Sequence, residues 1–102
     1  MKRLMTYIEE NIGNSDASPE DMAEATATSR SSLNRKVNRI LGMTPMEFMR
    51  EARIRKACQL LQEGRIGTND IAYACGFSDP KYFSRCFKQS TGMSPSECRN
   101  AS

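Results

Sequence analysis

Hydrophobic residues recur along the chain at helical spacing, and no segment shows the sustained alternation of apolar and polar residues that marks a strand. The clearest apolar stripe lies in residues 30–41, at positions i, i+4, i+7 and i+8, and consists of Leu33, Val37, Ile40 and Leu41. Residues 80–91 repeat the pattern with Phe83 and Phe87. The pattern predicts an all-α fold of seven helices, at about 2–12, 19–26, 30–41, 45–63, 69–75, 80–91 and 95–100.

The expected helix ends carry capping signals. Three helices begin with a hydroxyl residue followed by proline, at Ser18-Pro19, Thr44-Pro45 and Ser94-Pro95. In the last two cases a glutamate at the third helical position completes a capping box. Gly42 and Gly92 stand where a residue of left-handed conformation would close the preceding helix.

A shift of 50 residues aligns the two halves of the chain. It superimposes Gly42-Met43-Thr44-Pro45 on Gly92-Met93-Ser94-Pro95, and Arg35 on Arg85. Each half holds a short helix, a tight turn and a longer helix, which is the order of a helix-turn-helix motif. We therefore expect two helix-turn-helix units, over about residues 1–44 and 64–102, within one domain of residues 1–102.

The two longer helices have matching polar faces. The residues concerned are Ser31, Asn34, Arg35 and Asn38 in the first helix and Lys81, Ser84, Arg85 and Lys88 in the second. Arginine can donate two hydrogen bonds to guanine, asparagine can pair with adenine, and serine or lysine can contact bases or phosphates. For either helix alone, a solvated face of an ordinary bundle is the simpler interpretation. Two faces that match at a fixed shift favour a pair of recognition helices for the major groove of duplex DNA.

Positive charge is concentrated in the same segments. The 102 residues have a net charge of +3. Residues 1–26 sum to −4, whereas residues 27–41 contain four basic residues and no acid, and residues 79–93 sum to +2. Such clustering is the electrostatic footprint expected of a protein that binds phosphates.

A long central helix over about residues 45–63 is expected to join the units. Its apolar residues can pack on both of them, namely Phe48, Ala52, Ile54, Ala57, Leu60 and Leu61. The helix would span roughly 28 Å at 1.5 Å per residue. This length suits two recognition helices held about one DNA turn, or ~34 Å, apart. The resulting hypothesis is that one chain reads two successive major grooves.

The composition argues against catalysis and metal binding. The chain has no histidine, the commonest general base, and no Gly-rich phosphate loop. No C-x-x-C pair occurs among the four cysteines, which are interpreted as small apolar residues on helix faces in a reducing compartment: Cys58, Cys75, Cys86 and Cys98. We expect no enzymatic activity, no metal and no cofactor.

The expected location is the cytoplasm. No apolar run is long enough to span a membrane, and Glu9 and Glu10 interrupt the N-terminal segment before a signal sequence could form. The expected partner is double-stranded DNA, with no membrane contact and no small-molecule ligand for these 102 residues.

Two segments carry a resemblance to a known family. Residues 71–88, IAYACGFSDPKYFSRCFK, followed by Gly92-Met93-Ser94-Pro95, closely resemble the signature of AraC/XylS-family transcription regulators. Residues 29–36 and 42–45 are similar to the first unit of that family, and residues 53–61 to its linking helix. Residues 79–87 also resemble the C-terminal output domain of hybrid two-component regulators from Bacteroidetes.

The resemblance implies a seven-helix, homeodomain-like DNA-binding domain of two units that activates transcription near promoters. Family base contacts, carried over by position, fall on Ser31, Asn34, Arg35, Lys81, Ser84 and Arg85, with an apolar contact at Pro80. Phosphate contacts fall on Ser29, Arg30, Ser32, Asn38, Ser78, Tyr82 and Lys88. RNA polymerase is a candidate further partner, and a dimer is a candidate state of the parent protein.

Two positions depart from the family's pattern. Ala27 stands in the first turn where the family often has glycine, so a distorted turn is expected there. Cys98 stands where an aromatic residue is common, so weaker packing of the last helix is expected.

Two other functions compete with DNA binding. A helical protein-interaction module would use the basic faces for an acidic partner, but it has no need to duplicate a polar face at a fixed shift. An RNA-binding module would expose aromatic platforms, whereas Phe77, Phe83 and Phe87 fall at core positions.

Overall fold

The computed structural model describes residues 2–100, and over this stretch every regular element is an α-helix. The helices are α1 (Lys2–Asn11), α2 (Pro19–Ala25), α3 (Arg30–Leu41), α4 (Pro45–Glu63), α5 (Thr68–Ala74), α6 (Pro80–Thr91) and α7 (Pro95–Asn100). The predicted all-α fold is confirmed, and each predicted helix end lies within one residue of the observed one. Residues 1, 101 and 102 of the expected domain lie outside the described residues.

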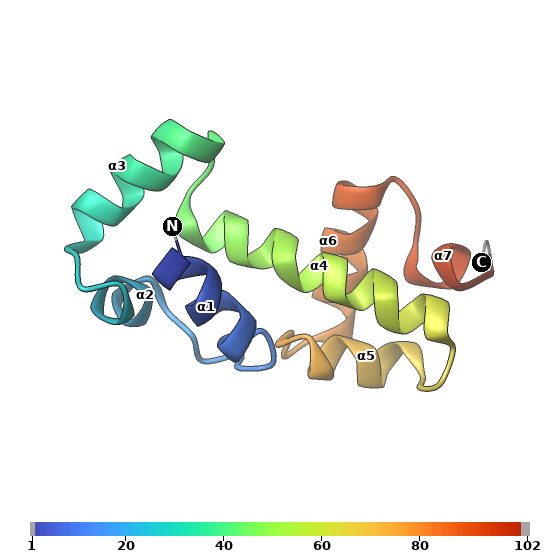
Figure 1. Ribbon diagram of the computed structural model, residues 1–102. Coiled ribbons are helices and arrows are strands. Elements are labelled where there is room, and N and C mark those ends of the chain that lie inside the picture. Colours follow the sequence, from blue (N-terminus) through green and yellow to red (C-terminus); the bar gives the residue numbers. More distant parts are fainter. Residues whose placement is uncertain (1, 101–102) are drawn as a thin grey trace.

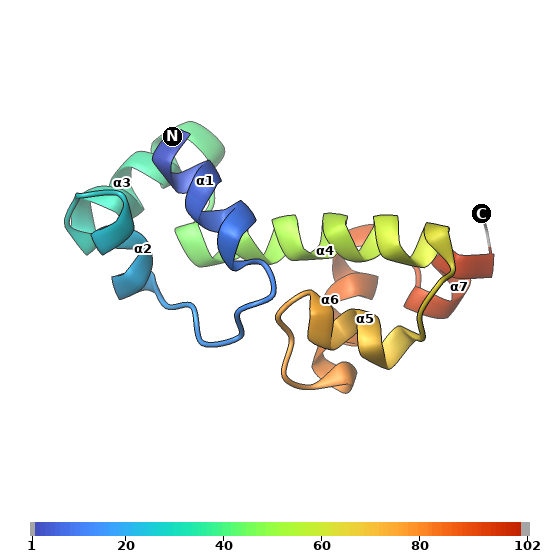
Figure 2. The same cartoon turned by 60° about the horizontal axis from the view of Figure 1, so that its bottom comes forward.

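The long helix α4 is the axis of the molecule (Figure 1). The first helix-turn-helix, α2 and α3, packs at the N-terminal end of α4, and α1 packs on α2 (Figures 1 and 2). α6 crosses the middle of α4, while α5 and α7 pack along its C-terminal part. The molecule measures 42 × 22 × 22 Å. The predicted arrangement of two helix-turn-helix units joined by a central helix is therefore confirmed.

Each unit has its own hydrophobic core. The first consists of Leu4, Tyr7, Ile8, Ala17, Met22, Ala23, Leu33, Val37 and Met49. The second consists of Ile54, Ala57, Leu61, Ile71, Ala72, Cys75, Phe77, Phe83, Cys86 and Phe87. Met49 and Ile54 are close neighbours on α4 but belong to different cores, so α4 contributes buried side chains to both units. Full burial of a side chain of this size contributes roughly 1.5–3 kcal/mol.

Ile40 does not join the first core, contrary to the predicted apolar stripe. Leu33 and Val37 are buried and Leu41 packs against the cluster, but Ile40 is 53% exposed. α3 packs mainly on α2 and α4, and these helices cover the middle of its stripe. Ile40 lies near the end of α3 and at the edge of the stripe, where it borders the basic residues Lys36 and Arg39.

The predicted capping signals are present. At the start of α4, the Thr44 hydroxyl accepts from the backbone N–H of Glu47 at 3.1 Å, and the Glu47 carboxylate accepts from the N–H of Thr44 at 3.3 Å. Ser94 and Glu97 repeat this box at the start of α7, at 3.2 and 3.3 Å. An N-cap of this kind stabilises a helix by typically ~1 kcal/mol. The two boxes fix where the chain turns after each longer helix of the repeat.

The last helix is held to the second core although Cys98 replaces an aromatic residue. Cys98 and Cys58 are half-buried and pack against that core. Burial, together with the neighbouring Cys98 thiol, raises the pKa of Cys58. The Arg99 guanidinium also donates a hydrogen bond to the backbone carbonyl of Ile66, in the loop between α4 and α5. Side chains on both sides of α7 therefore attach it to α4 and its following loop.

The two helix-turn-helix turns have the same hydrogen-bond pattern. In the first, the Thr28 N–H donates to the Ala23 carbonyl at 3.0 Å, and in the second Phe77 donates to Ala72 at 3.0 Å. The left-handed residue is Ala27 in the first turn, with φ 55°, and Gly76 in the second, with φ 84°. The expected distortion of the first turn is thus absent. The turn keeps its shape because Ala27 adopts a left-handed conformation that is unfavourable for alanine.

Replacing this alanine by glycine should stabilise the protein. The left-handed conformation costs an alanine roughly 1–2 kcal/mol, and the greater chain entropy of glycine offsets about 0.5–1 kcal/mol of the gain. We expect Ala27→Gly to raise the free energy of unfolding by about 0.5–1 kcal/mol, measured by urea denaturation. Ala25→Gly, at an exposed helical position two residues earlier, is the control and should lower it. Equal losses for both variants would contradict the account.

Candidate nucleic-acid interface

α3 and α6 begin and end in equivalent ways. The Ser29 hydroxyl caps α3 by accepting from the Ser32 N–H at 3.2 Å, and the Asp79 carboxylate caps α6 by accepting from the Lys81 N–H at 3.0 Å. Each helix closes at a left-handed glycine, Gly42 or Gly92. The two twelve-residue helices therefore present corresponding positions at corresponding places in the two units.

The predicted base-contacting residues lie on open faces of these helices. Side chains exposed to solvent are those of Ser31, Asn34, Arg35, Lys81 and Arg85, while Ser84 is half-buried. On α3, a shallow groove is lined by Ser31, Asn34, Arg35, Asn38 and Arg39. The structure thus groups Asn38, expected at a phosphate, with the side chains expected at bases. Arg39 was missed by the sequence analysis, although its spacing of four from Arg35 would have revealed it.

Several predicted phosphate-contacting residues already have partners within the protein. The Ser29 hydroxyl donates to the Ser32 hydroxyl at 2.9 Å, and the Arg30 guanidinium pairs with the Glu20 carboxylate at 2.7 Å. The Arg30–Glu20 pair is largely exposed on both sides. Exposed pairs contribute about 0.2–1 kcal/mol, so a phosphate can compete with this carboxylate. Ser78 and Lys88 are exposed on either side of the predicted base-contacting positions of the second unit.

Tyr82 connects α6 to α4. Its hydroxyl accepts a hydrogen bond from the Arg50 guanidinium at 3.4 Å, and this bond raises the pKa of Arg50. The hydroxyl proton of Tyr82 remains available to an acceptor such as a phosphate oxygen. Arg50 adds a fixed positive charge beside it. Sequence analysis did not find Arg50, because its position on the central helix shows no relation to the polar face of α6.

An aromatic cluster holds α6 in place from behind. The rings of Phe77 and Phe83 lie 5.1 Å apart between centroids, and those of Phe83 and Phe87 lie 5.7 Å apart. All three side chains are buried, as the sequence predicted. Tilted ring pairs at such distances add about 0.5–1.5 kcal/mol beyond simple burial. These aromatic residues therefore support α6 and provide no exposed stacking platform.

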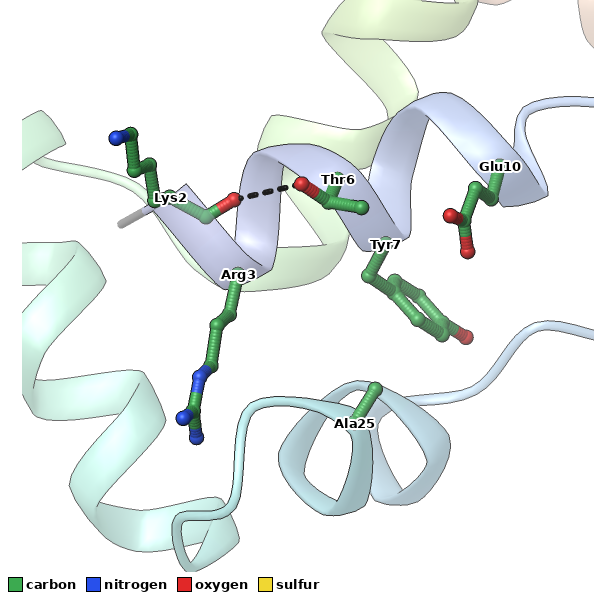
Figure 3. A pocket seen from close by; sticks show the side chains of 6 residues that line it. All are labelled: Lys2, Arg3, Thr6, Tyr7, Glu10 and Ala25. Atoms are coloured by element: carbon green, nitrogen blue, oxygen red, sulfur yellow. Dashed lines mark hydrogen bonds between the residues drawn. The ribbon is translucent and has the colours of Figure 1, made fainter.

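The first unit also has a surface groove away from the polar face of α3. It lies between α1 and α2 and is lined by Lys2, Arg3, Thr6, Tyr7, Glu10 and Ala25 (Figure 3). Thr6 is engaged locally, because its hydroxyl donates to the Lys2 carbonyl at 3.1 Å. Burial, followed by the charge of Asp21, raises the pKa of Tyr7. The groove is open and its charges are mixed, with two cations at one end and Glu10 at the other.

Within residues 2–100, no three side chains of Cys, Asp and Glu gather as a metal site would require. None of the helices in that stretch combines the length and apolar character needed to cross a membrane.

These features define a class of protein: a DNA-binding domain built from two helix-turn-helix units. A family model described as a helix-turn-helix domain matches residues 22–101. The chain belongs to the AraC-type helix-turn-helix family of transcription regulators.

Individual relatives agree with this assignment. The chain is 33% identical to "Histidine kinase P4" of Formosa agariphila and 32% identical to the "HTH-type transcriptional activator RhaS" of Enterobacter sp. (strain 638). These alignments cover 98% and 97% of the chain but only 7% and 35% of the relatives. A transcriptional regulator of Chromobacterium violaceum, described as AraC-type, has a TM-score of 0.90 at 31% identity, covering 97% of this chain and 88% of that one.

Proposed function

We propose that this domain binds a specific duplex DNA sequence by placing α3 and α6 in successive major grooves. The observation that carries the proposal is the pair of matching, exposed polar faces on two equivalent helices. Separate cores hold these helices on α4, with α3 at its N-terminal end and α6 across its middle (Figure 1). The molecule is 42 Å long, which leaves room for recognition helices about one DNA turn, ~34 Å, apart.

The proposed roles divide the polar residues into two groups. Base edges are read by Ser31, Asn34, Arg35, Lys81, Ser84 and Arg85, and the exposed position of Asn38 in the α3 groove adds it to this group. Phosphates are bound by Ser29, Arg30, Ser32, Ser78, Tyr82 and Lys88, with Arg50 supporting Tyr82. The first group decides which sequence is bound, and the second decides how tightly any duplex is held.

The parent protein is proposed to regulate transcription as an activator in the cytoplasm. The name of the RhaS relative supports activation, and that of the kinase relative supports a two-component system. The short share of these relatives covered by the chain is consistent with a DNA-binding part of a longer regulator. RNA polymerase is the proposed further partner, and a dimeric parent would place two such domains on one promoter.

Two classes of variant test the proposed roles. Arg35→Ala and Arg85→Ala should each weaken the preferred site by about 1–3 kcal/mol and relax specificity at one base position. Lys88→Ala should weaken all sequences alike and reduce the salt slope of binding by about one unit. Affinities for the preferred site and a scrambled duplex, each measured against salt concentration, separate these outcomes.

Arg55→Ala is the control for loss of charge, since Arg55 lies on α4 in a groove that it shares with Glu9 and Ile12 and that no residue of α3 or α6 lines. It should leave sequence preference unchanged. If Arg35→Ala and Arg85→Ala weakened preferred and scrambled duplexes equally, the base-reading roles would be wrong. Tight binding to an acidic protein, together with weak and sequence-blind DNA binding, would favour an interaction module instead.

A further inference from the structure

Arg53, near the middle of α4, is the one charged residue that is buried among residues 2–100, with 8% of its surface exposed. No carboxylate pairs with Arg53: among the described residues, the one ion pair joins Arg30 and Glu20 on the surface. Burial lowers the pKa of Arg53. A buried cation without an acidic partner is unfavourable unless other groups compensate for the lost water. The surroundings of its guanidinium therefore indicate what this residue does.

The Arg53 guanidinium lies where the two units touch. Its Nη2 donates to the backbone carbonyl of Asn14, in the loop after α1, at 2.8 Å. Its Nε has no hydrogen-bond partner and faces Gly76, in the turn between α5 and α6, so closely that a Cβ on Gly76 would lie 2.9 Å away. The Arg53 guanidinium thus hydrogen-bonds to the loop of the first unit and also lies close against the turn of the second unit.

The loop and the turn also touch each other directly. A Cβ on Gly76 would lie 2.2 Å from the carbonyl oxygen of Ile12, and a Cβ on Gly13 would lie 3.1 Å from that of Ala74. Figures 1 and 2 both show the loop after α1 beside the turn that follows α5. Residues 12–14 and 74–76, together with the Arg53 side chain that reaches them from α4, form a second connection between the units. We call this connection the junction.

Electrostatics favours a cation at the junction. The loop follows the C-terminus of α1, and the turn follows the C-terminus of α5. Helix C-termini carry unpaired carbonyl groups and a partial negative charge. The guanidinium lies near both helix ends, and its hydrogen bond to the Asn14 carbonyl compensates in part for its burial. A lysine would keep the charge but could not contact both segments with a planar group.

We propose that Arg53 is a positioning residue that fixes the orientation of the first unit relative to the second. Since each unit has a separate core, α4 would otherwise be their main connection, and a single helix can bend. With the junction formed, α3 and α6 are held at one separation. The consequence for DNA, which rests on the proposed function, is that Arg53 sets the spacing between half-sites that the domain accepts.

Residual dipolar couplings of the backbone amides test the orientation without any DNA. In the wild-type protein, one alignment tensor should fit α2–α3 and α5–α6 together. In Arg53→Met, each unit should keep its own internal couplings, but the two units should require different tensors. Arg55→Met is the matched control, because it removes an exposed cation two residues along the same helix, and it should keep one tensor. A single shared tensor in Arg53→Met would overturn the proposal.

Spacing of half-sites provides the second readout. The preference of the wild-type domain for its best spacing over one changed by a base pair should fall by roughly tenfold in Arg53→Met, equivalent to about 1.4 kcal/mol. Binding to an isolated half-site should not change. An unaltered spacing preference would overturn the role in DNA recognition. If the tensors separate but the wild-type domain has no sequence preference, the orienting role stands and the proposed function fails.

Arg53→Lys keeps the test decisive if Arg53→Met does not fold. The lysine variant retains the buried charge and most of the side-chain volume but loses the planar contact with both segments. We expect it to show two tensors and a reduced spacing preference, though less than the methionine variant. Wild-type behaviour of Arg53→Lys in both measurements would show that a cation suffices and that the two-sided contact has no orienting role.

Discussion

Gly76→Ala should reduce the free energy of unfolding by about 3–5 kcal/mol, a large part of the ~5–15 kcal/mol typical of a domain. Two effects act together. The residue has φ 84°, a conformation that costs an alanine roughly 1–2 kcal/mol. The added methyl group would also lie 2.2 Å from the Ile12 carbonyl oxygen and 2.9 Å from the Arg53 guanidinium, so the backbone at the junction must move. Urea denaturation of the purified domain measures the loss.

Gly92→Ala separates the two effects. Gly92 has nearly the same backbone conformation, φ 82°, but no atom lies within 4 Å of the position that a Cβ would take. This variant should lose only the conformational part, about 0.5–1 kcal/mol once the lower chain entropy of alanine is included. Equal losses at the two positions would mean that the close approach of the units at Gly76 is not a feature of the folded protein.

Phe87→Ala should reduce the free energy of unfolding by about 3–5 kcal/mol, because it leaves a large cavity in the second core. Phe87 is fully buried, and its ring stacks at a tilt against that of Phe83 on the inner side of α6. The loss of stability should concentrate in the second unit, because Phe87 belongs to the second core and the first core is a separate cluster. Denaturation measures the total effect, and amide hydrogen exchange locates it.

Tyr73→Ala is the control for this variant, as it removes an aromatic side chain that is 53% exposed on α5. It should change the free energy of unfolding by no more than about 0.5 kcal/mol. Hydrogen exchange in Phe87→Ala should accelerate in α5 and α6 more than in α2 and α3. Uniform acceleration in both units would contradict the description of two separate cores.

Features set by short stretches of chain were predictable from the sequence. Three helix starts were marked by a hydroxyl residue followed by proline, such as Thr44-Pro45 with Glu47, and the structure forms the expected capping hydrogen bonds. The polar face of α3 followed from helical spacing alone, because residues three and four apart lie on one side of a helix. Local signals of this kind do not depend on how the helices pack.

Features set by tertiary packing were not predictable. Ile40 has the spacing of a core residue, yet its side chain is exposed while the neighbouring Leu41 packs against the first core. Arg53 looks like any other arginine on a long helix, and its burial depends on two segments about 40 and 20 residues away in sequence meeting over it. Arg50 likewise gained its relation to Tyr82 only through the packing of α4 against α6.

The central claim is that one domain reads a specific DNA sequence through two major grooves. Selection of the purified domain on a random duplex library, followed by affinity measurements of the winners against salt, tests it most directly. We predict a motif of two half-sites whose centres lie about one helical turn, roughly 10–10.5 base pairs, apart. Enrichment of a single half-site, or of a diffuse preference that moderate salt abolishes, would contradict the claim.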